Sequence, residues 1–132
     1  MKKIKFPTFE KGQVLPIVVI GLIVVISMTA LILDGGSVMV NRRRAQNAAD
    51  AGALAGAHDL CLNKAASIVE ATAKDYAINK NKATNATVSI NGKVITVTTE
   101  IQQNSFFARI FNQSKLTSTA VAAAGCFPPS VA

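Results

Sequence analysis

The side chains best suited to chemistry in this sequence are few, and their spacing does not form a catalytic site. The only histidine, His58, precedes Asp59 in a helical stretch, and neighbouring residues of a helix point about 100° apart. We therefore expect His58 at the surface and not in an acid–base pair. Two distant cysteines and one histidine do not supply a zinc site, and no glycine-rich phosphate loop follows a strand. The sequence predicts no enzymatic activity, no cofactor, no metal and no small-molecule substrate.

Two cysteines and a run of three arginines have uses other than catalysis. Cys61 and Cys126 both follow the apolar segment described below. In an oxidising compartment two such cysteines are expected to form one disulfide, and two unpaired buried thiols are the alternative. Arg42, Arg43 and Arg44 form a basic collar. Three arginines are too few to indicate nucleic-acid readout, so the collar is either solvated or paired with acidic groups of neighbouring copies.

These residues are positioned by a chain of 132 residues that is 50% hydrophobic, 5% aromatic and carries a net charge of +7. This length corresponds to one domain, and so much apolar material excludes whole-chain disorder. Residues 14–33 contain no charge, and a helix of this length is about 30 Å long, the thickness of a bilayer core. We predict a transmembrane helix here. A buried core helix would need a larger protein around it, and a signal peptide would need an earlier cleavage site.

The basic residues on either side of this segment suggest its orientation. Four lysines lie in residues 1–13, three arginines follow the span at Arg42–Arg44, and Asp34 lies at the second boundary. Positive residues mark the cytoplasmic side. We expect residues 1–13 to be a basic cytoplasmic leader, and the remainder to lie outside the membrane as a single-pass protein.

Residues 34–80 are predicted to be helical, after a weak point at Asp34-Gly35-Gly36 where the span could bend. The first part of this range is rich in alanine and glycine, and the second part has a stripe of apolar residues along one face of the helix. The small residues recur at a spacing of four, which lets another backbone approach closely. The predicted helix-packing face consists of Ala45, Ala48, Ala49, Gly52, Ala53, Gly56 and Ala57. We expect helices of other subunits, or of other copies in a homo-oligomer, to pack on it; an alanine-rich stalk without a partner is the alternative.

Residues 81–132 are predicted to form an antiparallel sheet. Asn91-Gly92 lies between two alternating segments and favours a type I′ hairpin loop, which would pair Ile90 with Lys93, Val88 with Ile95 and Ala86 with Val97. A short helix is expected over 105–111, and a third strand over 115–124. The predicted fold is a membrane-anchored α+β protein, in which a long N-terminal helix carries a small three-stranded head, as in the lollipop shape of pilins.

The order of these features resembles the N-terminal region of TadE/TadG-like proteins of the Flp (Tad) pilus assembly system. The resemblance covers about residues 10–57 and lies in Glu10-Lys-Gly-Gln13, the apolar span, Asp34-Gly-Gly36 and the run from Arg42 to Ala57. Residues 106–111 and the following strand are also similar to the family's downstream portion. The resemblance implies a bacterial inner-membrane protein with its head outside, or a component of a cell-surface pilus used in adherence.

The function implied is that of a non-catalytic component of a Tad/Flp-type, type IV-related pilus, either a minor pilin or an assembly protein. Its partners would be membrane lipid and other pilin-like subunits. Gly12-Gln13 is similar to a prepilin-peptidase site, although the position that holds glutamate in pilins is Ile17, so a processed and an unprocessed chain both stay open. The alternative is a stand-alone single-pass envelope anchor whose head binds an unrelated extracytoplasmic partner.

Overall fold

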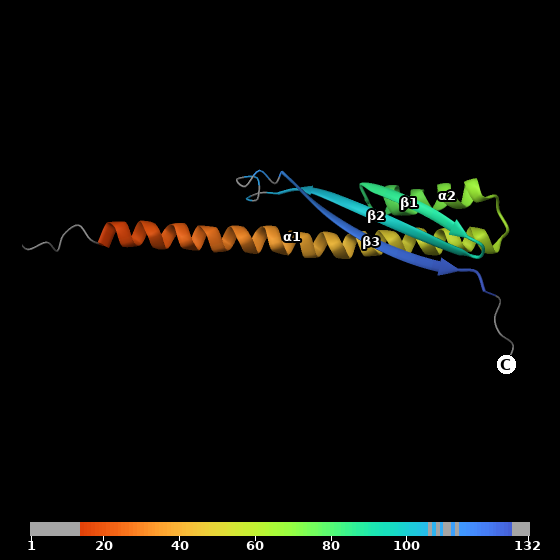
Figure 1. The fold of residues 1–132 in the computed structure, drawn as a ribbon, viewed down its shortest axis with the longest axis horizontal. Helices are drawn as coiled ribbons and strands as arrows, with labels where there is room; N and C mark the ends of the chain where they lie inside the picture. Colours follow the sequence, from red (N-terminus) through yellow and green to blue (C-terminus); the bar gives the residue numbers. More distant parts are fainter. Residues whose placement is uncertain (1–13, 106, 108, 110–111, 113, 128–132) are drawn as a thin grey trace, which may run out of the picture.

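The computed structural model describes residues 14–105, 107, 109, 112 and 114–127, and its main feature is one long helix with a small head packed along its C-terminal half (Figure 1). The head contains a second helix, a short π-helix and a three-stranded sheet. In chain order the elements are α1 (Val14–Cys61), α2 (Ala66–Lys74), the π-helix η1 (Asp75–Lys80), β1 (Asn85–Asn91), β2 (Val94–Asn104) and β3 (Lys115–Gly125). The predicted fold class, a long N-terminal helix followed by a three-stranded antiparallel sheet, is confirmed.

Helix α1 has 48 residues and is therefore about 72 Å long. Pro16 lies in its first turn, where the missing N–H removes no helical hydrogen bond. In its apolar half, the hydroxyl of Ser27 donates to the carbonyl of Ile23 at 2.8 Å, so this polar group is satisfied within the helix. The helix continues without a break through Asp34–Gly36, the predicted weak point, because glycine lowers helix stability only modestly where the turns on both sides propagate the hydrogen bonds.

The helix ends at Cys61, whereas the sequence favoured helical structure from residue 34 to residue 80. Asn63 adopts a φ of 51°, the left-handed conformation that commonly ends helices at asparagine or glycine. The amide of Asn63 donates to the carbonyl of Leu60 at 3.1 Å. The chain then turns back, so that α2 runs antiparallel to α1 and forms a separate layer of the head (Figure 1).

The sheet has the order β1-β2-β3 and is antiparallel throughout. The predicted hairpin exists, but its register is wrong by two residues: Ile90 pairs with Ile95 and Asn91 with Val94, which leaves Gly92-Lys93 as the loop. Gly92 has a φ of 60° at the first loop position, as in a type II′ turn. The observed register places isoleucine opposite isoleucine and removes the predicted Ile90–Lys93 pair. A shift of two residues keeps every side chain on its predicted face.

Strand β2 runs along α1 toward the apolar half of the helix, and β3 returns in the opposite direction, so both strands extend along α1 (Figure 1). One face of the sheet packs on α1 and α2. The core near the far end of α1 consists of Ala53, Ala57, Val69, Ala73, Ala77, Ala86, Ile95 and Val97, and a second cluster consists of Ala45, Ala49, Ile101 and Ala120. The third predicted strand is thus confirmed, whereas the predicted helix over 105–111 lies mostly outside the described residues.

Candidate functional site

The first candidate feature is the apolar half of α1, which the head leaves uncovered. An 18-residue window of this helix has a mean hydropathy of 2.8, long and apolar enough to cross a membrane. Its large side chains are exposed along the whole segment, for example Leu15 at 73% and Leu31 at 77%. A soluble protein would lose much free energy by exposing so many aliphatic side chains to water. The geometry is therefore that of a helix whose surroundings are apolar, and it suggests a membrane anchor.

The second candidate feature is the small-residue face of α1, and the structure brings all of its predicted members together. Ala45, Ala48 and Ala49 are each 0% exposed. The remaining four are covered as well: Gly52, Ala53, Gly56 and Ala57. What covers them is α2 and the sheet of the same chain. The expectation that helices of other subunits pack on this face is therefore wrong for the folded chain, because its own head already occupies the face.

The two glycines of this face lie where three elements meet. A Cβ built on Gly52 would lie 2.9 Å from the carbonyl oxygen of Ala73 in α2 and 3.3 Å from a methyl of Val97 in β2. A Cβ on Gly56 would lie 2.3 Å from the terminal methyl of Ile95 and 3.1 Å from the Cβ of Ala73. All four distances are shorter than the contacts between heavy atoms in packed cores. The small-residue spacing thus serves the close approach that it predicts, but within one chain.

Three polar contacts fasten the sheet and the β2–β3 connection to α1, and sequence reasoning identified none of them. The hydroxyl of Thr99, which is fully buried, donates to the carbonyl of Ala45 at 2.7 Å. The amide of Asn41 donates to the side-chain oxygen of Gln103. Nearest the apolar half, the backbone N–H of Phe107 donates to a carboxylate oxygen of Asp34 at 3.1 Å. These residues are 54 to 73 positions apart in the chain, so no local sequence signal could reveal them.

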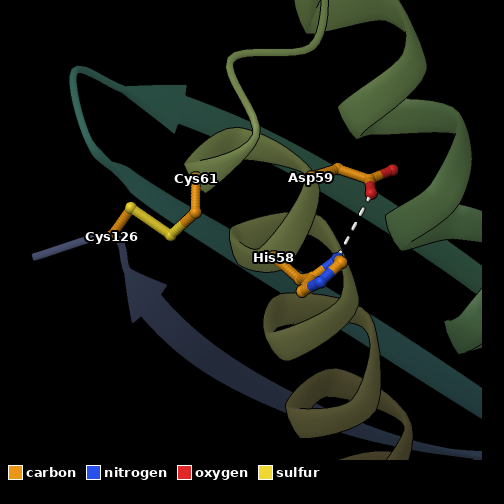
Figure 2. Close-up of a disulfide and its surroundings, with 4 residues drawn as sticks. All are labelled: His58, Asp59, Cys61 and Cys126. Atoms are coloured by element: carbon orange, nitrogen blue, oxygen red, sulfur yellow. Dashed lines mark ion pairs between the residues drawn. A yellow bond between two sulfur atoms is a disulfide. The ribbon is translucent and has the colours of Figure 1, made fainter.

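Asp59 is the buried charge of the head (Figure 2). Its carboxylate accepts hydrogen bonds from the Lys64 ammonium and from the Thr72 hydroxyl, each at 2.8 Å. The hydrogen bond from Lys64 is the main reason that the pKa of Asp59 lies below its ordinary value; Thr72 acts in the same direction, and desolvation opposes both. The contact ties the end of α1 to the turn after it and to α2, so its role is structural.

His58 lies at the surface, as predicted, with 74% of its side chain exposed. Its Nδ1 lies 3.5 Å from an Asp59 oxygen (Figure 2), closer than the helical geometry led us to expect. Since Lys64 and Thr72 already hold that carboxylate, His58 adds only a long and solvent-screened ion pair. Beside it, an open hollow of about 480 Å³ lies between α1 and α2, and Leu54, Thr72 and Tyr76 contribute to its mostly apolar lining.

The disulfide predicted between Cys61 and Cys126 is present (Figure 2). It joins the last residue of α1 to the residue after β3, at the end of the head far from the apolar half (Figure 1). The backbone N–H of Cys126 also donates to the carbonyl of Lys93 in the hairpin loop at 2.9 Å. The bridge closes the head by connecting its first and last elements.

The other predicted site residues lie apart from this core. Arg42, Arg43 and Arg44 are all exposed on α1, as expected of a basic collar. Gly12 and Gln13, the candidate cleavage site, lie outside the described residues. Within the part of the chain that the structure describes, no three His, Cys, Asp or Glu residues are grouped so that they could hold a metal ion.

Comparison with known protein families gives a match over the helical region. Residues 12–59 match the Tad family model, described as Flp pilus-assembly TadE/G-like. This region contains the apolar half of α1, the basic collar and the whole small-residue face. The predicted resemblance is thus confirmed for the helix, whereas residues 106–111 lie beyond the match. No curated protein and no solved structure matches the chain.

Proposed function

We propose that this chain, whose residues 12–59 are TadE/G-like, is a non-catalytic subunit of a Tad/Flp-type pilus system, either a minor pilin or an assembly protein. The observation that carries the proposal is that the family match and the structural unit coincide. The match begins two residues before α1 and ends two residues before the helix does. A pilus-related role for this helical region follows from the match, and the subunit role is our inference.

The proposed mechanism depends on packing and presentation. The apolar half of α1 sits in the bacterial inner membrane, with residues 1–13 inside and the head outside, as the distribution of lysines favours. The disulfide supports this orientation, because such bonds persist outside the reducing cytosol. The head then displays a surface to other pilus components. Because the small-residue face is already covered, contacts with other subunits or with other copies use the exposed surfaces of α1 and of the sheet.

A second candidate is a stand-alone envelope anchor whose head binds an unrelated extracytoplasmic partner. One observation favours it: the family match stops at residue 59, so α2 and all three strands lie outside the matched region. The two candidates share the anchor and differ in what the head contacts.

The experiment that distinguishes them follows the full-length chain, with an epitope at its C-terminus, in piliated cells. Under the pilin hypothesis, part of the chain appears in filaments that are sheared from the surface. Under the assembly-protein hypothesis, it stays in the membrane fraction but its deletion abolishes piliation. If deletion leaves piliation intact and no chain is found in filaments, the pilus role is refuted and the stand-alone anchor is favoured. N-terminal sequencing of the mature chain shows whether cleavage follows Gly12.

A matched pair of fusions tests orientation. Alkaline phosphatase attached after the last residue should be active, since it folds only outside the cytosol, whereas the same enzyme attached before the span should be inactive. The reverse pattern would refute the proposed topology without affecting the family assignment.

A further inference from the structure

The charges of the ectodomain are distributed unevenly along α1. Residues 34–132 contain ten basic and six acidic side chains, which gives a net charge of +4. Half of the basic residues lie at the end of the head next to the apolar segment: they are Arg42, Arg43, Arg44, Arg109 and Lys115. Two acids also lie at this end, Asp34 and Glu100, which follows the Thr99 that contacts Ala45. The rest of the head carries five lysines and four acids. Three of the four net positive charges therefore lie at the membrane-facing end.

The position of Arg109 and Lys115 follows from the backbone. Lys115 begins β3 and pairs with Asn104, the last residue of β2. The connection between these strands is closed by a hydrogen bond from the N–H of Ser105 to the carbonyl of Ser114 at 3.2 Å. Arg109 and Lys115 are both exposed. Arg109 in the β2–β3 connection and Lys115 at the start of β3 thus lie at the same end of the head as the arginine collar of α1.

The contact between Phe107 and Asp34 fixes the level of this connection relative to the bilayer. Asp34 directly follows the apolar segment and accepts the N–H of Phe107 at 3.1 Å. If the segment spans the hydrocarbon core, Asp34 lies at its boundary, and the headgroup layer extends roughly 5–8 Å beyond it. Phe107 is therefore level with the lipid headgroups. The collar begins eight residues further along the helix, about 12 Å higher, which is within about a Debye length of the headgroup layer.

From this arrangement we propose that the membrane-facing end of the head docks on anionic lipid headgroups. Arginine side chains bind phosphate oxygens with paired hydrogen bonds, and basic residues next to a span are attracted to an anionic surface. Phe107, which is half-buried, supplies an apolar ring of the kind that inserts at the boundary between headgroups and acyl chains. The inference rests on the proposed membrane anchor and adds a second, lipid-specific contact that holds the head down against the bilayer.

The chain contains no tryptophan, so a single introduced tryptophan reports its own depth. We would reconstitute the full chain in nanodiscs of neutral lipid alone, or of neutral lipid with phosphatidylglycerol, each with and without brominated acyl chains. In Phe107→Trp, bromine quenching should be at least twofold stronger in the anionic discs. Tyr76→Trp, in η1 beside Leu54 of α1 and so about 30 Å of helix beyond Asp34, should be quenched in neither. High salt should remove the difference, because the attraction is electrostatic.

Charge variants distinguish docking at this end of the head from a general effect of the protein's net charge. In the Phe107→Trp background, Arg109→Glu with Lys115→Glu should lower quenching in anionic discs to the level of neutral discs. Reversing two distant lysines, Lys74→Glu in α2 with Lys93→Glu beside Cys126, makes the same change in net charge and should have no effect. A non-reducing gel that shows the Cys61–Cys126 bridge confirms that each variant has folded.

The outcomes identify which inference fails. Equal quenching of Phe107→Trp in neutral and anionic discs overturns the docking proposal, as does an effect of the distant lysines as large as that of the near pair. A tryptophan at Val24, within the apolar segment, tests the anchor separately. If Val24→Trp is quenched and Phe107→Trp is not, the anchor holds and docking is refuted. If Val24→Trp is not quenched in either lipid, the membrane anchor itself is wrong.

Discussion

Replacement of Gly52 by alanine has two opposing effects on the stability of the head: a gain in helix propensity and a loss from steric overlap. Alanine is about 1 kcal/mol more favourable than glycine inside a helix, so at an open position the change stabilises. At Gly52, however, the new methyl would lie 2.9 Å from the carbonyl oxygen of Ala73 and 3.3 Å from the Cβ of Ala77. Both alanines are fully buried, Ala73 in α2 and Ala77 in η1. To relieve the contact, the backbone of α2 must move, because a carbonyl oxygen has no side-chain torsion through which to yield.

Overpacking of a closed core costs roughly 1–3 kcal/mol, which exceeds the gain in helix propensity. We expect Gly52→Ala to lower the stability of the head by about 1–2 kcal/mol, since the opposing group is backbone. For a head of this size, the Tm should fall by about 5 °C or more. Gly36→Ala is the matched control on the same helix, because nothing lies within 4 Å of its added Cβ, and it should raise the Tm or leave it unchanged.

The measurement is thermal unfolding of the full chain in detergent, followed by the fluorescence of Tyr76. This is the chain's only tyrosine, and it lies in η1 beside the hollow between α1 and α2. Loss of the α1–α2 contact should change its emission. A Gly52→Ala protein with a Tm at or above that of the wild type, while Gly36→Ala behaves as expected, would refute the close packing of α1 and α2 at this position.

Three further predictions concern the contacts that hold the head together. Because the pKa of Asp59 is lowered in the folded state, its stabilising contribution is present above the ordinary carboxyl pKa and is lost as the pH falls through the folded pKa. Asp59→Asn should therefore lower the Tm at neutral pH and reduce the fall in Tm on acidification. A variant whose Tm falls with acid as much as that of the wild type would contradict this. Cys126→Ser removes a bridge between residues 65 positions apart and should lower the free energy of unfolding by about 4 kcal/mol. The Tm of the variant should then equal that of the reduced wild type. Equal Tm values for the variant and the oxidised wild type would show that the bridge does not stabilise the head. Thr99→Val removes the buried hydroxyl that donates to the carbonyl of Ala45 and should lower the free energy of unfolding, measured in urea, by about 1 kcal/mol. Thr98→Val, on the opposite face of the sheet, should change it by less than about 0.5 kcal/mol. Equal effects of the two substitutions would show that this hydrogen bond does not stabilise the head.

The alternation of apolar residues in the hairpin was sufficient to predict two strands and their faces, but not the register. Asn91-Gly92 suggested a loop at those two positions, while the loop formed is Gly92-Lys93. Both registers place the same side chains on the same faces, so face patterning cannot separate them. The observed register matches Val88 with Val97, and these side-chain pairs, together with contacts to α1, determine the choice.

The small-residue face shows a different limit. Small residues at a spacing of four predict that another backbone packs closely on the helix, but they do not identify whether that backbone belongs to the same chain or to another. The answer depends on where α1 ends, because a chain that turns back after Cys61 places α2 on Gly52 and Gly56. Asn63 carries the signal for that turn, since asparagine readily adopts the left-handed conformation that it has here. The sequence alone could not show that this asparagine ends the helix, because the helical pattern of apolar residues continues beyond it.

The contacts between α1 and the head also determine how the head moves with the apolar half of α1. They begin with the pair Asp34–Phe107 at the end of the apolar segment and finish with the bridge at Cys61, so they cover about 42 Å of helix. No unstructured residue separates the apolar half of α1 from the half that carries the head. A tilt or rotation of the apolar half of α1 is therefore transmitted directly to the sheet. A chain of this shape cannot reorient its head on a flexible tether, and the surfaces that it presents are fixed by the position of α1 in its surroundings.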